Sequence, residues 1–150
     1  MDDPNNWFGC NSTYPGAPGG DTYNVVFPAA ANLAPVDDIS NMTVNSITFQ
    51  GNYSSYAEGY DISSDGVTSG SNTITVTGGI TDSSTGQTNN IALGITASGN
   101  QTFTTSSSNT QLNIGDGSDP ITISNNLTLG NVVVNSPLAG SGTLIASDAN

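Results

Sequence analysis

The chain has 150 residues, which suits one domain or one fragment of a longer repetitive protein. It contains no Lys, Arg or His, and its 12 acidic residues give a net charge of -12. Nucleic acid, anionic membrane surfaces and phosphate ligands are therefore excluded as partners, because each needs cationic side chains to neutralise it. Side-chain salt bridges cannot form, so stability has to come from burial and backbone hydrogen bonds.

Gly, Asn, Ser and Thr make up about half of the chain. This composition can indicate disorder, but here β-branched residues recur in periodic runs, which disordered chains lack. The single cysteine, Cys10, cannot form an internal disulfide and has no base nearby to activate it. The acidic start has no signal-peptide pattern, so we expect that a leader was removed or that the chain is a segment of a longer protein.

Residues 1–36 are expected to form an N-terminal cap and a first strand. Trp7 and Phe8 stand among several Pro and Gly residues, a loop composition, and we expect these aromatic rings to cover one end of the core, with a carbohydrate-stacking platform as the alternative. A strand follows at residues 24–27 and ends at Pro28. The segment 28–36 has Pro near both ends, which favours an extended connection over a helix.

Residues 37–150 alternate apolar and polar side chains with a period of two, as half-buried strands do. No segment has a helical period. Gly-containing breaks at residues 78–79, 99, 115–117 and 130 are expected to be corners. The apolar groups are Met42 and Val44, Ile47 and Phe49, Ile74 and Val76, residues 91–95, Phe103, Leu112 and Ile114, Ile121 and Ile123, Leu127 and Leu129, and residues 132–134.

A polar segment, residues 52–72, interrupts the alternation. It carries Tyr53, Tyr56 and Tyr60 and one short apolar pair, Tyr60 with Ile62. We interpret it as a loop or bulged corner that projects from the body. The three tyrosines are the candidate ligand contacts of the chain.

Short strands, small polar corners and the absence of a helical pattern predict an all-β fold, a β-solenoid in which the strands of successive coils stack on one another. The expected period is 27 to 30 residues, which places Ile47 beside Ile74 and Ile91 beside Ile121. A β-sandwich is the alternative, because it also uses many short strands. Hairpin signals disfavour the sandwich, since only Asp65-Gly66 and Asp116-Gly117 qualify.

Two segments resemble bacterial autotransporter passenger domains, covering most of the chain. The first carries Asn6-Trp7, Pro15-Gly16, Gly20-Asp21 and the strand at residues 25–27. The second, residues 39–51 with 72–117 and 140–150, is similar to the passenger-associated strand repeats of the same proteins. The resemblance implies a right-handed parallel β-helix exported to the cell surface, acting in adhesion or as a rigid stalk. The sequence departs from the family by lacking a C-terminal membrane barrel and all Lys.

Catalysis is not expected. Polysaccharide lyases of this fold need an Arg or Lys base, which the chain lacks. Inverting hydrolysis needs only carboxylates, but the candidates lie in apparent corners of a chain with little room for a cleft: Asp61, Asp65, Asp116 and Asp119. The turn at residues 115–119 could bind Ca²⁺ through Asp116 and Asp119, but it does not match a full calcium-loop pattern, and an Asp that accepts a backbone N–H bond is the favoured interpretation.

A row of threonines, Thr73, Thr75 and Thr77, points outward if Ile74 and Val76 point inward. Flat threonine arrays on solenoids can order water, as in ice-binding proteins. In the expected register the matching outward positions on the other coils are Ser46, Thr48, Asn90, Ala92, Thr122 and Ser124. Asn90 and Ala92 are not threonines, so they interrupt the array. Threonine also favours strands by propensity alone, and ice binding therefore ranks below the adhesive and filament functions.

The sequence predicts a secreted, non-catalytic structural or adhesive protein of a cell surface, an adhesin or stalk segment, with glycans or host and abiotic surfaces as partners. The alternative is a secreted β-rich subunit that polymerises into a filament, by strand exchange through residues 22–27 or by end-to-end stacking. Its last residues, 142–150, carry no evident cap, and an uncovered strand is a template for stacking.

Overall fold

The computed structural model describes residues 23–28, 36–37, 42–51, 59–64, 73–106 and 110–147. These residues form strands and no helix, so no described helix is long and apolar enough to cross a membrane. The strands are β1 (Tyr23–Phe27), β2 (Val36–Asp37), β3 (Thr43–Phe49), β4 (Asp61–Ser64), β5 (Thr73–Asp82), β6 (Thr88–Ala92), β7 (Gly94–Ala97), β8 (Gln101–Thr105), β9 (Gln111–Ile114), β10 (Ile121–Ile123), β11 (Asn126–Gly130), β12 (Val132–Val134), β13 (Leu138–Gly140) and β14 (Thr143–Ser147).

The strands form two curled sheets in which every described pairing is parallel. The larger sheet divides at β5, whose first half pairs with β7 and whose second half pairs with β8. We call β13, β10, β7, the first half of β5 and the start of β3 (Thr43 and Val44) the first strip. The second strip runs β14, β11, β8, the second half of β5, the rest of β3, and β1. The smaller sheet, β12-β9-β6-β4-β2, is the third strip.

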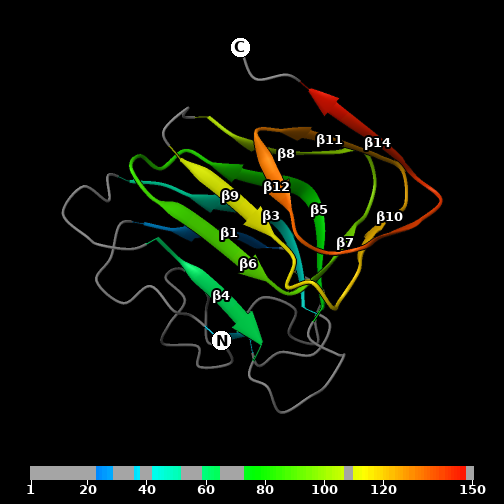
Figure 1. The fold of residues 1–150 in the computed structure, drawn as a ribbon, viewed down its shortest axis with the longest axis horizontal. Coiled ribbons are helices and arrows are strands. Elements are labelled where there is room, and N and C mark those ends of the chain that lie inside the picture. Colours follow the sequence, from blue (N-terminus) through cyan, green and yellow to red (C-terminus); the bar gives the residue numbers. More distant parts are fainter. Residues whose placement is uncertain are drawn as a thin grey trace.

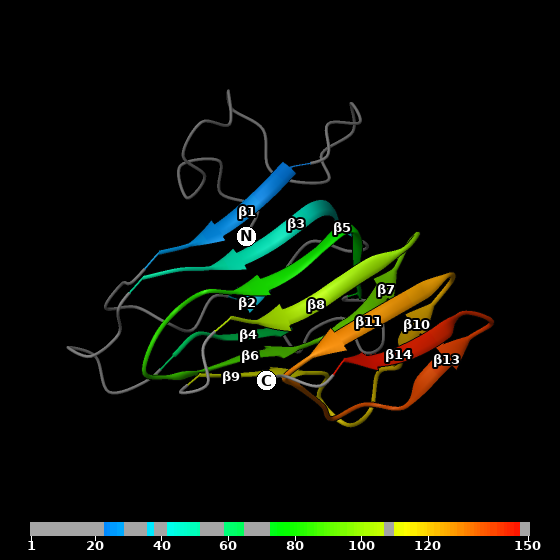
Figure 2. The same cartoon turned by 90° about the horizontal axis from the view of Figure 1, so that it is seen from above.

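The three strips surround the core on three sides (Figure 1). Seen from above, the strands of the second strip lie side by side in the order β1, β3, β5, β8, β11 and β14 (Figure 2). The sequence prediction of an all-β fold is confirmed. A β-sandwich would join neighbouring strands by antiparallel hairpins, and the described pairs have none.

A bend inside β5 carries the chain from the first strip to the second. The sequence predicts that Gly78 and Gly79 end the strand, but the strand continues through them to Asp82. Pairing with β3 slips at this point, from Val44 opposite Val76 to Ser46 opposite Gly79. Gly79 has a φ of 111°, and an added Cβ would lie 2.7 Å from the Thr102 carbonyl oxygen. The corner therefore requires glycine but does not end the strand.

The predicted strand at residues 91–95 is divided in the structure. Residues up to Ala92 belong to β6 in the third strip, and β7 in the first strip begins at Gly94. Leu93, the residue between them, is 1% exposed, so the chain turns with its apolar side chain inside. The alternation of apolar residues continues through this corner, so the sequence pattern gave no sign of it.

The register differs from the predicted period. Ile47 pairs with Ile80 rather than Ile74, and Ile91 pairs with Ile114 rather than Ile121. The offset between paired residues ranges from 33, between Ile47 and Ile80, to 17, between Ile121 and Leu138. Polar connections of different lengths can join strands without changing the strand-to-strand contacts, so no single period exists.

The inward side chains of all three strips form one continuous apolar core. Each fully buried aliphatic or aromatic side chain stabilises the fold by about 1.5–3 kcal/mol. The largest completely buried members are Phe49, Phe103, Met42, Ile62, Ile74, Ile80, Ile91, Leu93, Ile95, Leu112 and Ile114.

An aromatic cluster closes the core near β1. Phe27 stacks on Phe49, with ring centroids 5.2 Å apart, and the Tyr60 ring lies 4.9 Å from Phe27. The Tyr60 hydroxyl donates a hydrogen bond of 2.6 Å to the Pro28 carbonyl. Burial of Tyr60, which is 5% exposed, raises its pKa.

Tyr60 therefore lies in the core and not on a projecting loop, and the residues after it form β4. The sequence places this tyrosine with the polar residues before it, but its ring follows the inward direction of Ile62, two positions later. Tyr53 and Tyr56 lie outside the described residues, so their role as ligand contacts stays a prediction.

Replacing Tyr60 should separate packing from hydrogen bonding. We expect Tyr60→Ser to lower the free energy of unfolding by about 3 kcal/mol or more, because it opens a cavity between two phenylalanine rings. Tyr60→Phe should cost only about 1 kcal/mol, the contribution of the hydrogen bond to Pro28. Denaturant unfolding measures both values, and equal stability of Tyr60→Ser and the native chain would contradict the core position.

Candidate binding surfaces

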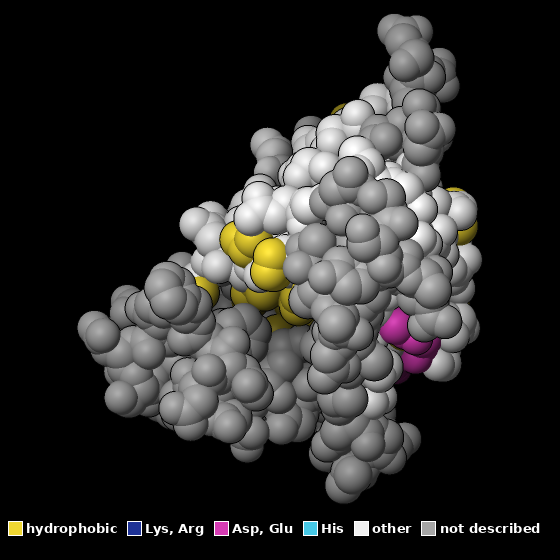
Figure 3. Space-filling view, turned by 90° about the vertical axis from the view of Figure 1, so that its left-hand side faces the viewer, with side chains coloured by type: hydrophobic (Ala, Val, Ile, Leu, Met, Phe, Trp, Pro, Cys, Tyr) yellow, Lys and Arg dark blue, Asp and Glu magenta, His cyan; other side chains and the backbone are white. Residues whose placement is uncertain are grey.

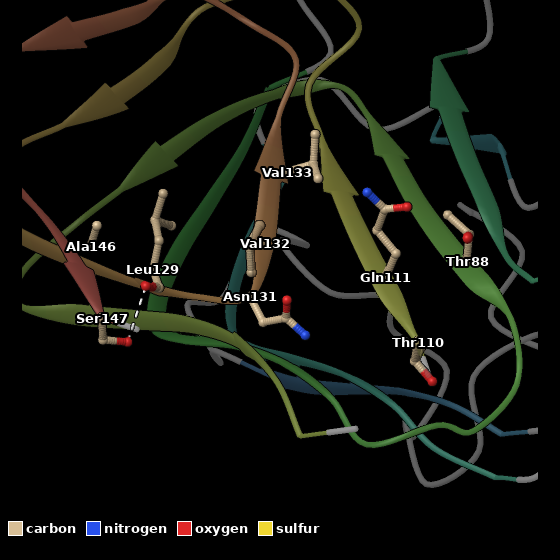
Figure 4. A pocket seen from close by; sticks show the side chains of 9 residues that line it. All are labelled: Thr88, Thr110, Gln111, Leu129, Asn131, Val132, Val133, Ala146 and Ser147. Atoms are coloured by element: carbon tan, nitrogen blue, oxygen red, sulfur yellow. Dashed lines mark hydrogen bonds between the residues drawn. The ribbon is translucent and has the colours of Figure 1, made fainter. Parts of the chain in front are cut away.

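A hollow of about 580 Å³ opens between the ends of the second and third strips. Figure 4 shows its lining, with Leu129, Ala146 and Ser147 on one side and Gln111, Thr88 and Thr110 on the other. The remaining lining residues, Asn131, Val132 and Val133, lie between the two groups.

The lining is uncharged. Amide groups come from Gln111 and Asn131, hydroxyls from threonine and serine, and apolar surface from two valines, a leucine and an alanine. Two of the hydroxyls already donate within the protein, Ser147 to the Leu129 carbonyl at 3.1 Å and Thr110 to the Ser84 carbonyl at 3.0 Å. The hollow can therefore offer hydrogen bonds to a neutral ligand, but it holds no acid or base.

The backbone at Asn131 aims this residue into the hollow. Its φ is 57°, in the left-handed region that Asn enters more readily than most residues. The residue stands alone between β11 and β12, where the chain passes from the second strip to the third. Sequence reasoning missed this site because its members come from five strands and two positions between strands, Thr110 and Asn131.

Apolar side chains are uncovered where the first and second strips end. Leu138 on β13 pairs with the buried Ile121, and Leu144 on β14 pairs with the buried Leu127, so both occupy inward positions. They are nevertheless 44% and 41% exposed. No described strand pairs with the outer edges of β12, β13 and β14. The apolar core is thus open at this end.

A buried polar cluster lies between β5 and β6. Asp82 is fully buried at an inward position, paired with Phe49 on one side and Thr105 on the other. Its Oδ1 accepts hydrogen bonds from the Ser84 amide at 3.0 Å and the Ser84 hydroxyl at 2.5 Å. Its Oδ2 accepts one from Asn89 Nδ2 at 2.8 Å.

Asn89 connects this cluster to the aromatic one. Its Oδ1 accepts a hydrogen bond of 2.8 Å from the Tyr60 amide. The polar groups of Asp82, Ser84 and Asn89 are hydrogen-bonded to one another inside the core, which indicates a structural role for these residues. Neither Asp82 nor Asn89 was a candidate from sequence, because both read as corner residues.

The carboxylates proposed for hydrolysis are dispersed. Asp61 is exposed on β4, and Asp116 and Asp119 lie in the turn between β9 and β10. Asp65 lies outside the described residues. Figure 3 shows one side of the molecule, where acidic side chains form one small group apart from most of the hydrophobic ones.

Asp116 is a turn residue. Its Oδ1 accepts hydrogen bonds from the backbone amides of Ser118 at 2.8 Å and Asp119 at 2.9 Å. The bond from Asp119, more than the others, holds the pKa of Asp116 below its usual value. Among the described residues no three acidic, Cys or His side chains gather to hold a metal ion. The sequence favoured a turn role for Asp116 over calcium binding, and the hydrogen bonds of its carboxylate agree with that interpretation.

Comparison with known proteins found no matching family model, no matching curated sequence and no matching solved structure. The likeness to autotransporter passenger domains therefore rests on the sequence motifs alone.

Asp82 offers a test of the buried cluster. We expect Asp82→Ala to lower the free energy of unfolding by about 3 kcal/mol, because it leaves buried donors of Ser84 and Asn89 without an acceptor. Asp61→Ala is the matched control: it removes an exposed carboxylate and should change stability by less than about 0.5 kcal/mol. Similar losses from both substitutions in denaturant unfolding would contradict a special role for Asp82.

Proposed function

We propose that the chain is a right-handed parallel β-helix that serves as a non-catalytic structural or adhesive segment of an extracellular surface protein. The observation that carries this proposal is the repeated passage of the chain through three parallel strips around one apolar core. Parallel strands joined by long crossovers are almost always connected with right-handed sense, which supports the handedness. Stacked passes give a stiff body whose length grows with each pass, as a stalk requires.

The chemistry of the surface supports a binding role and not a catalytic one. The hollow beside Asn131 has no titratable side chain, and the whole chain lacks the cationic groups that activate nucleophiles or stabilise developing negative charge. Without Lys or Arg the chain also offers no site to trypsin-like proteases, which suits exposure outside a cell.

Neutral glycans are the ligand class that best fits the hollow. Gln111 and Asn131 offer amide donors and acceptors, and Val132 and Val133 offer apolar surface for the C–H faces of a sugar ring. An acidic glycan would be repelled by the net charge of -12.

Glycan-array binding of the purified chain tests the adhesive role. We expect retention of neutral glycans, and loss of it in the double variant Gln111→Ala with Asn131→Gly, which removes both amides while keeping a residue suited to positive φ. Asn135→Ala, an exposed amide outside the hollow, should bind as the native chain does.

The double variant Tyr53→Ser with Tyr56→Ser tests the competing site in residues 52–58. Loss of binding only there would move the adhesive site away from the hollow. Binding to no glycan or cell surface, or measurable polysaccharide cleavage, would overturn the adhesive proposal.

A second candidate, assembly into a filament by end-to-end stacking, is favoured by the open end of the core. Leu138 and Leu144 point inward yet remain exposed, so a further layer of strands would bury them and pair with the edges of β13 and β14. A second copy of the chain could supply that layer, as in other strand-addition assemblies.

Sedimentation velocity over a wide concentration range tests stacking. If copies stack, the sedimentation coefficient should rise with concentration, and Leu138→Ser with Leu144→Ser should abolish the rise. Ile145→Ser is the matched control, because Ile145 is 42% exposed on the same strand but pairs with the outward Thr128. A native chain that stays monomeric throughout would overturn this candidate.

A further inference from the structure

A ladder of four threonines crosses the larger sheet. Thr43 of β3 pairs with Thr75 of β5, Thr75 pairs with Thr96 of β7, and Thr96 pairs with Thr122 of β10. The chain neighbours on β5, β7 and β10 are buried, among them Ile74, Ile95 and Ile121. The threonine side chains therefore point outward, and all four are partly exposed.

A second row of hydroxyls runs beside the ladder. Val76 pairs with Ala97, and Ala97 pairs with Ile123. The residue after each of these is Thr77, Ser98 or Ser124, two positions after a ladder threonine. Hydrogen bonds from the Ser98 amide to the Val76 carbonyl and from the Ser124 amide to the Ala97 carbonyl continue the strand alignment into this row.

The two rows form a two-dimensional array, for which the general dimensions of parallel sheets give the expected spacing. Parallel strands lie about 4.8 Å apart, and alternate residues of one strand lie about 6.6 Å apart. We call this surface, made of Thr43, Thr75, Thr96, Thr122, Thr77, Ser98 and Ser124, the threonine face.

The array could not be predicted from the sequence, because the register of the paired strands differs from the expected period of 27 to 30 residues. Placing Ile74 beside Ile47 and Ile121 beside Ile91 puts Asn90 and Ala92 in the threonine row. In the structure Ile74 pairs with Ile95, and Ile95 with Ile121, so threonine follows threonine.

The threonine face has the chemistry of a surface that orders water. It carries no charge and no aromatic ring. The threonine side chains are β-branched and have few rotamers, so the strands hold their hydroxyls and methyls in place, whereas Ser98 and Ser124 follow the ends of β7 and β10 and add hydroxyls alone. The Thr77 hydroxyl donates to the Val44 carbonyl at 3.3 Å, whereas the hydroxyls of Thr75, Thr96 and Thr122 form no hydrogen bond to another described residue and can bond to water.

We propose that the threonine face binds ice. A rigid lattice of hydroxyl and methyl groups matches a ligand that is itself a periodic lattice of donors and acceptors. Glycans are a poorer fit for this face, since sugar rings are usually held by aromatic side chains or by concave sites. This activity is separate from the hollow and from the open end.

The second strip provides an internal comparison. Thr48, Thr81 and Thr104 pair in one row, but Gly130 follows them. The neighbouring row includes Gly79 and Ile145, which carry no hydroxyl. Because both rows are interrupted, we expect the second strip to contribute little to ice binding.

Ice-affinity partitioning and thermal hysteresis of the purified chain test the proposal. The native chain is expected to concentrate in the ice fraction and to depress the freezing point below the melting point. Thr96→Tyr, which breaks the flat array, and Thr122→Lys, which adds a strongly hydrated charge, should each reduce both effects to the level of buffer. Thr102→Tyr, an exposed site on the second strip, is the matched control and should keep them.

Thermal unfolding shows whether each variant is folded, and the two threonine-face variants act by different means, so misfolding of one leaves the other to decide. A native chain excluded from ice would overturn the proposal. So would retention of activity in both folded threonine-face variants, or a loss confined to Thr102→Tyr.

Discussion

The structure depends on backbone hydrogen bonds between parallel strands that belong to successive passes of the chain. With no side-chain cation present, ion pairs cannot hold one pass against the next, so the ladders and the apolar side chains between them have to do so. The same register that aligns the backbone aligns identical side-chain types in rows. Buried isoleucines follow one another inside, and outside Asn113 donates to Asn90 across neighbouring strands at 2.8 Å. A change of register at one strand would therefore disturb the inside and the outside together.

Alternation in the sequence was sufficient to predict the all-β fold, most of the strands and most of the inward residues. It could not predict which strands are neighbours, because the offset between partners varies from 17 to 33 residues while the apolar groups look alike. A slip that pairs Ile47 with Ile74 rather than Ile80 keeps isoleucine beside isoleucine. The two registers differ in the bend at Gly78 and Gly79, through which the strand continues. From the local sequence alone, this bend looks the same as a corner that ends a strand.

The polar residues of the core were missed for a related reason. A sequence shows that Asp82 and Asn89 are polar, and polarity near Gly and Ser indicates an exposed corner. The structure buries both because they satisfy one another and the nearby Ser84. Whether a polar residue lies inside depends on partners that come together only when the register is known. Tyr60 is a related case: its polar sequence neighbours predicted an exposed position, but its ring is buried.

The exposed apolar residues of β14 belong to two different surfaces, which the amino-acid composition does not distinguish. Leu144 and Ile145 are almost equally exposed, at 41% and 42%. Leu144 belongs to the core column that stops at the open end, whereas Ile145 belongs to the outer side of the second strip. Burying Leu144 requires another layer along the stack, and that layer would meet a chain of the same high negative charge if it came from a second copy. Apolar burial and strand pairing favour stacking, while charge repulsion opposes it and weakens as salt screens the carboxylates. Charge repulsion does not oppose binding at the hollow or the threonine face, because a neutral ligand such as ice or an uncharged glycan brings no charge of its own.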